Sequence, residues 1–558
     1  MKKIYLVITL LMILFLYLSA YKIFGYIGTD SIWTNDSWNY VNNLASKGIT
    51  KFGQETCRWG SIERSEASGY DWSNLDVQIS EVESSGLNTY MFVTLWCCST
   101  WATERDCSSG KPSSRPKSLY TSKYQSWVQT AVERYDYDGI SDMSGLKRAH
   151  LDYQIEDEAQ NHGNVWQSST DCNIGKEKNY DQIGDNDGTC ETGEQCIDDT
   201  YDQQECSGYE YGETLKLAYN GAKAANSNVR IWSFSFNPGD YFDNNPASPN
   251  PSDAGGRYTF ANYVFNNYGS YMYGVAINCN YDYTGVKPFI NHVKTSWAKG
   301  KPVVCSDASS MPMLGKCIYQ SCNKYQGKCS HDYQVTCTSD LNCGSGNYCL
   351  GTDNDILNIL DNGTNCTPKP YCENKYIAIA KWAEREKSKM AVKKTLIAKA
   401  LDVDIFFQFM MNNDTSTRDP WVHSGWMSHG YLYQIFGPIG TVRSVGYTAQ
   451  ELSSEITSVT DEHPISAGTN PYSWDWIYQI SSSVYVVWND SSSTIDMSSY
   501  FSDNTVCVSE IITSLDDNHN PIKPEVKVYS KSAVPADDIP KYVYLCPDNI
   551  PPSPPTIY

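Results

Sequence analysis

The stretch Leu151-Asp-Tyr-Gln-Ile-Glu-Asp-Glu158 joins an alternating apolar pattern to three consecutive carboxylates. Its apolar residues alternate with polar ones up to Ile155, which predicts a short strand with one buried side. The carboxylates Glu156, Asp157 and Glu158 follow where that strand ends. Acidic side chains at the end of a buried strand are costly unless they are hydrogen-bonded or paired. The cluster therefore indicates a functional site rather than an ordinary surface.

Working outward from this stretch, short β-branched runs alternate with helical patterns from about residue 26 to residue 440. The eight expected strands cover residues 26–33, 49–58, 88–95, 151–157, 229–235, 272–279, 302–306 and 403–410. The helical patterns between them cover residues 75–85, 124–135, 211–225, 258–268, 286–298 and 376–400. This alternation predicts an α/β fold, a (β/α)8 TIM barrel over residues 25–440. On this count Glu158 follows the fourth strand and Asp307 follows the seventh.

Two cysteine-rich insertions interrupt the predicted barrel, at residues 171–207 and 312–373. They hold four and eight of the 20 cysteines in the chain. The even counts and an N-terminal export signal favour disulfides formed within each block, among the four cysteines from Cys172 to Cys206 and among the eight from Cys317 to Cys372, with the individual pairings left open. Zinc is the alternative for the eight-cysteine block, although no histidine spacing matches it. Both insertions follow expected strands, so they are predicted on the carboxyl-end face where barrels build active sites.

The N-terminal residues and the charge of the chain indicate where it works. Lys2 and Lys3 precede an apolar run at residues 4–20, so residues 1–24 are expected to be a signal peptide or a signal anchor that could tether the protein to a membrane. We expect an extracellular or cell-surface protein. A formal net charge of −21 disfavours nucleic acid and anionic membrane surfaces as partners. Five glycosylation sequons fit this location, at Asn35, Asn362, Asn365, Asn413 and Asn489.

After Gly440 the composition changes to alternating Ser, Thr, Val and Tyr. This pattern predicts a β-sandwich over residues 441–547, with strands at residues 476–480, 484–488, 507–512, 526–529 and 542–545. Residues 548–558 form a proline-rich tail that is expected to be extended.

Several motifs, taken in order, resemble retaining glycoside hydrolases of the large (β/α)8 superfamily, clan A type, similar to β-xylosidases and β-galactosidases. The matching stretches are Arg58-Trp59 with Glu63, Tyr70-Asp-Trp-Ser-Asn-Leu-Asp76, Trp101-Ala102, Arg134-Tyr-Asp136 through Lys147, Lys301-Pro-Val-Val-Cys-Ser-Asp307 and Val403-Asp-Ile-Phe-Phe407. The resemblance implies that Glu158 is the general acid/base and that Asp307 stands at the position of the nucleophile. Two departures accompany it, because Asp157 replaces the usual Asn before the acid/base and Asp307 replaces the usual Glu.

These departures leave three alternatives open. A retaining enzyme needs its two carboxyl groups about 5–5.5 Å apart, whereas an inverting enzyme holds them about 6.5–9.5 Å apart. The arm of Asp307 is one methylene shorter than that of Glu, which widens the gap unless the backbone shifts. The chain could therefore be a retaining hydrolase, a hydrolase with altered chemistry such as inversion, or a protein that binds sugar without cleaving it.

The resemblance also indicates residues that could bind substrate. Aromatic faces stack on the C–H groups of sugar rings, and aromatics make up 13% of the chain. The candidates are Asp157, Arg58, Trp59, Trp101, Tyr281 and Trp232; for each tryptophan the alternative is a place in the core. Arg58 could orient the nucleophile through a charge-assisted hydrogen bond.

No cofactor or metal is expected, because the sequence lacks a His-Glu-x-x-His zinc signature and a phosphate-binding glycine loop. Gly184-Asp-Asn-Asp-Gly188 resembles a calcium loop only loosely and reads otherwise as a plain acidic loop. The hypothesis from sequence is an exported glycoside hydrolase that acts on O-glycosidic bonds of a neutral oligo- or polysaccharide with two carboxylates. The alternative is a catalytically inactive, glycosidase-like carbohydrate-binding or structural protein of the cell surface.

Overall fold

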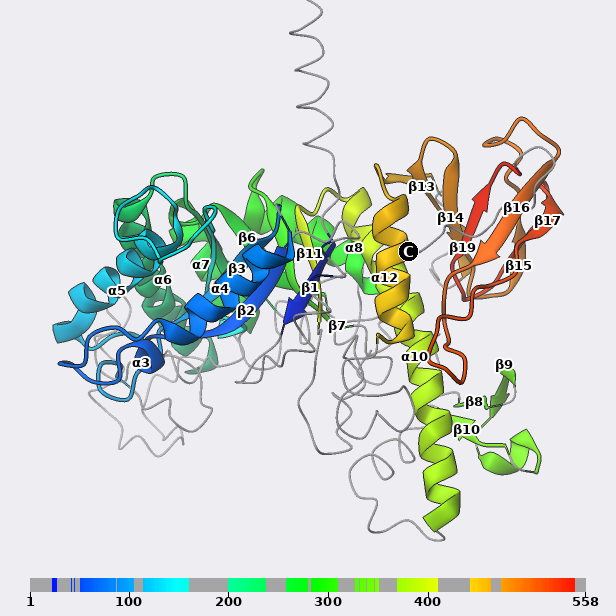
Figure 1. Ribbon diagram of the computed structural model, residues 1–558, viewed down its shortest axis with the longest axis horizontal. Helices are drawn as coiled ribbons and strands as arrows, with labels where there is room; N and C mark the ends of the chain where they lie inside the picture. Colours follow the sequence, from blue (N-terminus) through cyan, green and yellow to red (C-terminus); the bar gives the residue numbers. More distant parts are fainter. Residues whose placement is uncertain are drawn as a thin grey trace, which may run out of the picture. The chain divides into compact units, whose positions relative to one another are not determined.

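The computed structural model separates into two compact units, which we describe individually (Figure 1). The half-barrel unit comprises Phe52–Cys279 and Phe289–Ser306, and the C-terminal unit comprises the remaining segments, chiefly Asp307–Tyr558. The structure describes residues 23–27, 42, 45, 51–104 except 87, 114–159, 199–236, 257–279, 283–309, 327–350 except 331, 338 and 346, 369–409, 442–462 and 473–546.

A curved sheet of parallel strands forms the half-barrel unit (Figure 1). The spatial order of its strands, β7-β6-β5-β4-β3-β2, follows their order along the chain. The strands are β2 (Lys51–Arg58), β3 (Tyr90–Trp96), β4 (Asp152–Ile155), β5 (Arg230–Phe236), β6 (Gly274–Asn278) and β7 (Val303–Ser309). Pairing is parallel from β3 through β6, so the carboxyl ends of these strands lie at one edge.

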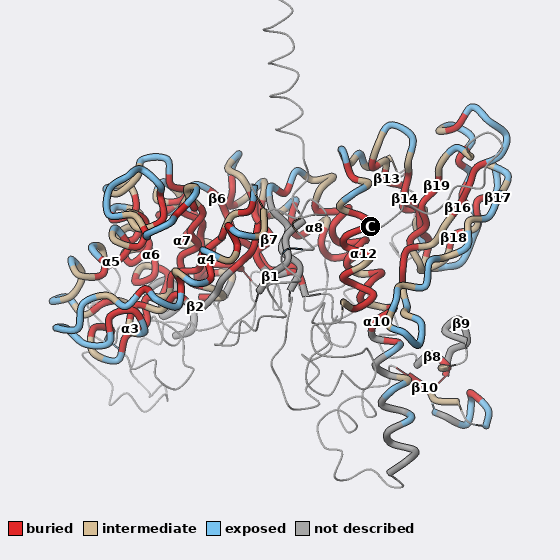
Figure 2. The backbone as a smooth tube through the Cα atoms, in the orientation of Figure 1, coloured by how far each residue is buried: buried red, intermediate tan, exposed pale blue. Residues whose placement is uncertain are grey.

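Helices connect successive strands of this sheet and bury one of its faces. They are α3 (Trp59–Ile62), α4 (Ser73–Ser85), α5 (Thr121–Tyr135), α6 (Asp199–Ala225), α7 (Arg257–Tyr268) and α8 (Tyr283–His292). Helix α6 packs between α5 and α7. The strands are buried almost throughout (Figure 2), which explains their continuous apolar runs, because a parallel sheet covered by helices exposes neither face.

The C-terminal unit holds a further parallel strand pair and two long helices. Strand β1 (Ile23–Ile27) pairs in parallel with β11 (Ile405–Phe409). Helix α10 (Lys369–Ala400) packs against α12 (Ser444–Glu455). Helix α12 lies within residues 441–547, the range expected to form the β-sandwich, and ahead of the first strand expected there.

The predicted C-terminal β domain is present as two antiparallel sheets that share one core. The larger has the order β12-β13-β14-β19-β16-β17 and the smaller pairs β15 with β18. Their bounds are β12 (Thr460–Asp461), β13 (Trp476–Ser481), β14 (Val484–Trp488), β15 (Ser493–Ile495), β16 (Thr505–Glu510), β17 (Lys527–Ser530), β18 (Val534–Ala536) and β19 (Lys541–Tyr544). Ile477, Val506 and Val543 of the larger sheet and Ile495 and Val534 of the smaller one belong to the same buried cluster.

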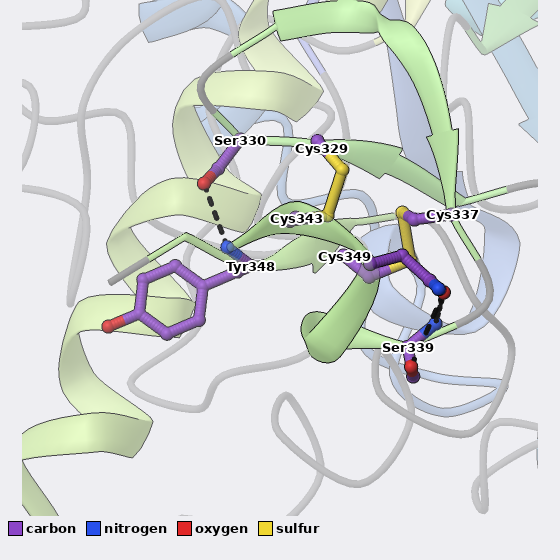
Figure 3. Close-up of a disulfide and its surroundings, with 8 residues drawn as sticks. Cys329, Ser330, Cys337, Ser339, Cys343, Tyr348 and Cys349 are labelled. Carbon is purple, nitrogen blue, oxygen red and sulfur yellow. Dashed lines mark hydrogen bonds between the residues drawn. A yellow bond between two sulfur atoms is a disulfide. The ribbon is translucent and has the colours of Figure 1, made fainter. Parts of the chain in front are cut away.

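Two disulfides staple the described part of the second insertion, Cys329–Cys343 and Cys337–Cys349 (Figure 3). They cross a small sheet made of β8 (Gly327–Cys329), β9 (Asp332–Cys337) and β10 (Cys349–Leu350). Pairing within the block is thus confirmed for these four cysteines, whose sulfurs are not available to bind zinc. The side chains of the other four cysteines of the block lie outside the described residues. The cysteine side chains of the first insertion lie outside the described residues. A third disulfide, Cys507–Cys546, closes the C-terminal sheet.

The structure also bears on glycosylation and membrane attachment. Asn489 is only 3% exposed, and its Nδ2 donates a hydrogen bond to Asp475 Oδ1 at 2.7 Å. A glycan would need that nitrogen at the surface, so the folded protein does not present this sequon. The other four sequons and residues 4–20 lie outside the described residues. Among the described residues, no helix has the length and apolar character needed to cross a membrane.

Candidate active site

Polar side chains from four consecutive strands meet at the carboxyl-end edge of the half-barrel sheet. Trp96 ends β3, Glu158 lies three residues beyond the end of β4, Ser235 lies near the end of β5, and Asn278 ends β6. Because these strands are parallel, their carboxyl ends bring the four residues to the same edge of the sheet.

Each of the three consecutive carboxylates is held by a different neighbouring strand or its following loop. Glu156 is buried and accepts a hydrogen bond from the backbone N–H of Cys97, just after β3. Asp157 accepts one from Ser235 Oγ on β5. Glu158 accepts one at its Oε1 from Asn278 Nδ2 on β6, at 2.6 Å. The sheet edge therefore orients all three acids.

The backbone that carries these acids is strained. Glu156 has a φ of 65° and Glu158 a φ of 44°, both in the left-handed region that non-glycine residues rarely adopt. Such a conformation costs about 1–3 kcal/mol per residue and persists where the surroundings hold it, commonly at functional sites. The hydrogen bonds from β3, β5 and β6 supply that restraint here. Strain and restraint together fix the direction of the Glu158 side chain.

Three buried polar atoms around these acids have no hydrogen-bond partner in the described part of the chain. They are Trp96 Nε1, Gln154 Oε1 and Asn278 Oδ1. Gln154 uses its Nε2 to donate to the backbone oxygen of Glu156 at 2.8 Å, which leaves its Oε1 available. Buried polar groups are nearly always satisfied, so these atoms mark positions for water or for the hydroxyls of a ligand.

The two expected catalytic carboxylates are described to different extents. Glu158 is partly exposed, three residues beyond the end of β4. Asp307 lies within β7, the strand after β6 in the sheet order, but its side chain lies outside the described residues. Tyr281 also lies outside them.

Arg58 and Trp101 are partly exposed at this end of the sheet. Arg58 ends β2, and its guanidinium carbon lies 5.6 Å from the centroid of the Trp96 ring. Trp101 follows β3, and its Nε1 donates to the backbone oxygen of Glu63 at 2.9 Å. The ammonium of Lys123 lies 5.2 Å from the Trp101 ring centroid. Both side chains are positioned so that a ligand could contact them.

Trp59 and Trp232, in contrast, belong to the packed interior. Trp59 is fully buried and donates through its Nε1 to Glu63 Oε2 at 2.8 Å. Trp232 is 1% exposed and donates to Oδ1 of Asp152, the first residue of β4, so it lies toward the amino end of the sheet. Neither ring has a face open to a sugar, and we correct the expectation that they bind one.

The buried thiols close to this edge are not suited to act as nucleophiles. Cys57 and Cys97 are buried and reduced. Burial raises the pKa of the Cys57 thiol, and burial together with the charge of Glu156 raises the pKa of the Cys97 thiol. Because the thiolate is the reactive form, both cysteines are chemically inert at neutral pH. The carboxylates remain the candidate reactive groups of this edge.

Comparison with known proteins bears on the fold. No protein-family model matches the chain, and no curated protein matches it. A solved family 39 glycoside hydrolase from the gut symbiont Bacteroides cellulosilyticus WH2 has a TM-score of 0.51 at 10% identity, covering 94% of this chain and 80% of its own. The fold resembles that of a TIM-barrel glycoside hydrolase.

Two further solved structures are less similar. A glucosidase from Croceicoccus marinus has a TM-score of 0.45 at 11% identity, covering 94% of this chain and 95% of its own. A GH30 endoxylanase from Clostridium papyrosolvens C71 also has a TM-score of 0.45, at 10% identity, covering 94% of this chain and 97% of its own. At such identities only the likeness of the fold is shown, so a role for any residue must be argued from this site.

Ser235, Gln154 and Asn278 were not among the residues expected from the sequence. Asn278 could have been identified from the sequence, because it is a polar residue at the end of the apolar run Gly274–Asn278. The acids follow β4 in the same way. Ser235 carries none, since it lies inside the apolar strand β5 and gains its role only from the register of β5 against its neighbours.

Proposed function

We propose that this protein is an exported glycoside hydrolase that cleaves O-glycosidic bonds of a neutral oligo- or polysaccharide, with Glu158 as its general acid/base. The observation that carries the proposal is the Asn278–Glu158 hydrogen bond. It fixes a partly exposed carboxyl group at the carboxyl-end edge of a parallel sheet, in a fold that resembles TIM-barrel glycoside hydrolases. In such folds this edge is where catalytic residues stand.

In the proposed reaction Glu158 protonates the leaving glycosidic oxygen and later removes a proton from water. One oxygen of its carboxyl group, Oε1, accepts a hydrogen bond from Asn278 Nδ2, which orients the group at this edge of the sheet. Proton transfer of this kind requires a donor held within hydrogen-bond distance of the bond that breaks. The strained backbone at Glu158 and its restraint by Ser235 Oγ, which accepts from the Glu158 N–H at 3.1 Å, serve that purpose.

Asp307 is proposed as the second carboxylate. Strand β7 carries it, and β7 follows β6 in the order of the sheet. A carboxyl separation of about 5–5.5 Å would make Asp307 a nucleophile and the enzyme retaining. The shorter arm of an aspartate would have to be offset by a shift of its backbone toward Glu158.

A neutral sugar is the proposed substrate class. The consecutive acids Glu156, Asp157 and Glu158 repel polyanionic chains, while hydroxyl groups can hydrogen-bond to carboxylates. The unpartnered atoms of Trp96 and Gln154 add a donor and an acceptor at the same edge. Trp101, after β3, offers a partly exposed aromatic ring. Export is supported by the three disulfides of the described residues, because such bonds persist in oxidising compartments.

Hydrolysis of a panel of neutral oligosaccharides and polysaccharides tests the proposal. We expect turnover by the wild-type chain, and a loss of about 10²- to 10⁴-fold in Glu158→Gln. Asp307→Asn should lose at least as much. Glu525→Gln is the matched control, because this exposed glutamate lies far along the chain in the C-terminal unit. The carbohydrate-binding alternative would instead be established if the wild type binds glycans without hydrolysing them and both variants still bind.

A further inference from the structure

The loop between α5 and β4 gathers three aspartates that no part of the proposed reaction uses. Asp136, Asp138 and Asp142 each contribute one carboxylate oxygen to a group whose members lie within 4.8 Å of one another. The loop precedes β4, so it lies at the amino end of the sheet, away from the edge that carries Glu158.

No cation of the described residues compensates these three charges. The nearest basic residue along the chain, Arg134, forms its ion pair with Asp76, at 2.6 Å. None of the three aspartates takes part in an ion pair within the described part of the chain. Like charges at this separation repel one another unless a proton or a cation is shared among them.

A second observation, separate from the clustering, points to a bound cation. Asp136 is 3% exposed, and its Oδ2 accepts a hydrogen bond from Asn226 Nδ2 at 3.2 Å. Its Oδ1 is buried and has no hydrogen-bond partner among the described residues. A buried carboxylate oxygen without a donor is costly, and the two neighbouring carboxylates make it more so. A metal ion would satisfy that oxygen and neutralise the group in one step.

The remaining acids are held in place by the backbone of the loop. The N–H groups of Tyr137 and Gly139 donate to the two oxygens of Asp142, at 3.1 and 2.8 Å. The N–H of Ile140 donates to Asp138 Oδ1 at 2.8 Å. The loop can therefore fold and present its carboxylates without a bound ion. A change of Asp138 to asparagine would remove the charge and keep an acceptor for the N–H of Ile140.

We propose that Asp136, Asp138 and Asp142 bind a calcium ion. Calcium takes six to eight oxygen ligands in a flexible arrangement, so three carboxylates can be completed by carbonyl oxygens and water. Magnesium demands near-ideal octahedral geometry and gives up its water reluctantly, which a loop of this kind does not favour. The ion would fasten the segment that leads into β4. It would stabilise the half-barrel sheet and take no part in cleavage, so the proposal stands independently of the proposed hydrolase.

Thermal unfolding and titration calorimetry of the full chain, stripped with EGTA and then supplied with CaCl2, test the site. We expect saturable binding with a Kd at or below about 10⁻³ M, and a rise in Tm of about 3 °C at saturation. Asp138→Asn keeps the acceptor for Ile140 but removes one charge, and should weaken binding at least tenfold. Asp136→Asn/Asp138→Asn should abolish it.

Asp71→Asn is the matched control, because exposed Asp71 also accepts a backbone N–H two residues ahead, from Ser73, but pairs with Arg64. It should bind calcium as the parent does. The proposal is overturned if the parent shows no saturable binding, or if Asp138→Asn binds as tightly as the parent. It is also overturned if MgCl2 raises Tm as much as CaCl2 does, since the effect would then be general charge screening. Should the double variant fail to fold, Asp138→Asn alone decides.

Discussion

Asn278 donates a hydrogen bond to Glu158 Oε1 across 2.6 Å, and so links the carboxyl ends of β6 and β4 over the intervening strand β5. Ser235 of β5 contacts both Asp157 and the backbone N–H of Glu158. Strands β5 and β6 thus both hold Glu158, β5 through its backbone N–H and β6 through its carboxyl group. The strained backbone of Glu158 cannot relax without breaking these contacts.

The first prediction concerns Asn278 as a positioning residue. Asn278→Ala frees the Glu158 carboxyl group to rotate, and misplacement by about 1 Å can reduce a rate by about 10²-fold. We expect kcat to fall by about 10- to 100-fold with little change in KM, and to fall more for substrates with poor leaving groups. Steady-state kinetics measure this, with Asn266→Ala on the exposed side of α7 as control. An equal loss for good and poor leaving groups would assign Asn278 a purely structural role.

The second prediction concerns the pH dependence of folding stability in the C-terminal unit. Burial, reinforced by the charge of Glu455, raises the pKa of Glu451 on α12 to about 8. A carboxyl group whose pKa is higher in the folded than in the unfolded chain makes its full contribution to stability below the unfolded pKa, where both states hold the proton. That contribution is lost as the pH rises through the pKa of the folded state. The free energy of unfolding should therefore fall between about pH 5 and pH 8, by at most about 1.4 kcal/mol per pH unit.

Glu451→Gln keeps the shape of this side chain without a titratable proton. Urea unfolding at several pH values should show a flatter profile for Glu451→Gln than for the parent, while exposed Glu525→Gln should follow the parent. A parent profile that rises between pH 5 and pH 8, with no difference in the variant, would contradict the assignment.

The third prediction concerns the disulfide Cys507–Cys546, which closes a loop with a sequence separation of 39. Chain-entropy arguments assign a loop of this size about 4 kcal/mol of stability. Replacing both cysteines by alanine should lower the free energy of unfolding of the C-terminal sheet by about 2–5 kcal/mol in urea. The same exchange at Cys329 and Cys343 is the control, because that bond belongs to a separate small sheet. Equal stability of parent and Cys507/Cys546 variant would refute the prediction.

Much of the fold was predictable because the parallel strands are locally encoded. The apolar run expected at residues 272–279 is β6 (Gly274–Asn278), and the one expected at 88–95 is β3 (Tyr90–Trp96). These strands are covered by helices on one face and pack against the interior on the other, so they contain few polar residues. Their continuous apolar runs are therefore easy to distinguish from the helical patterns between them.

Helix α12 was missed although its sequence carries a helical signal. Val445, Ala449 and Leu452 repeat at intervals of four and three residues and are all buried. The surrounding Ser, Thr and Tyr residues favour strands, and this composition concealed the period. Helix α6 likewise begins at Asp199, within the segment expected to belong to the first insertion.

The site was only partly predictable, because it depends on contacts between distant segments. Glu158 could be singled out from the end of its own strand. Asn278 lies 120 residues later, and its hydrogen bond to Glu158 could not be predicted, because the sequence alone does not specify how β4, β5 and β6 align. The resemblance could not decide between sugar binding and the core for Trp59 and Trp232, because a tryptophan of either kind looks the same in a sequence until its packing is known.

The role of Glu158 as a general acid is best tested by how hydrolysis in Glu158→Gln depends on the leaving group. A general acid is needed to protonate a poor leaving group and not an activated aryl oxide. We predict that Glu158→Gln retains much of its bond-cleaving rate on activated aryl glycosides but nearly none on natural glycosides, whereas Asp307→Asn fails on both. Wild-type turnover on natural glycosides that survives Glu158→Gln unchanged would contradict the account.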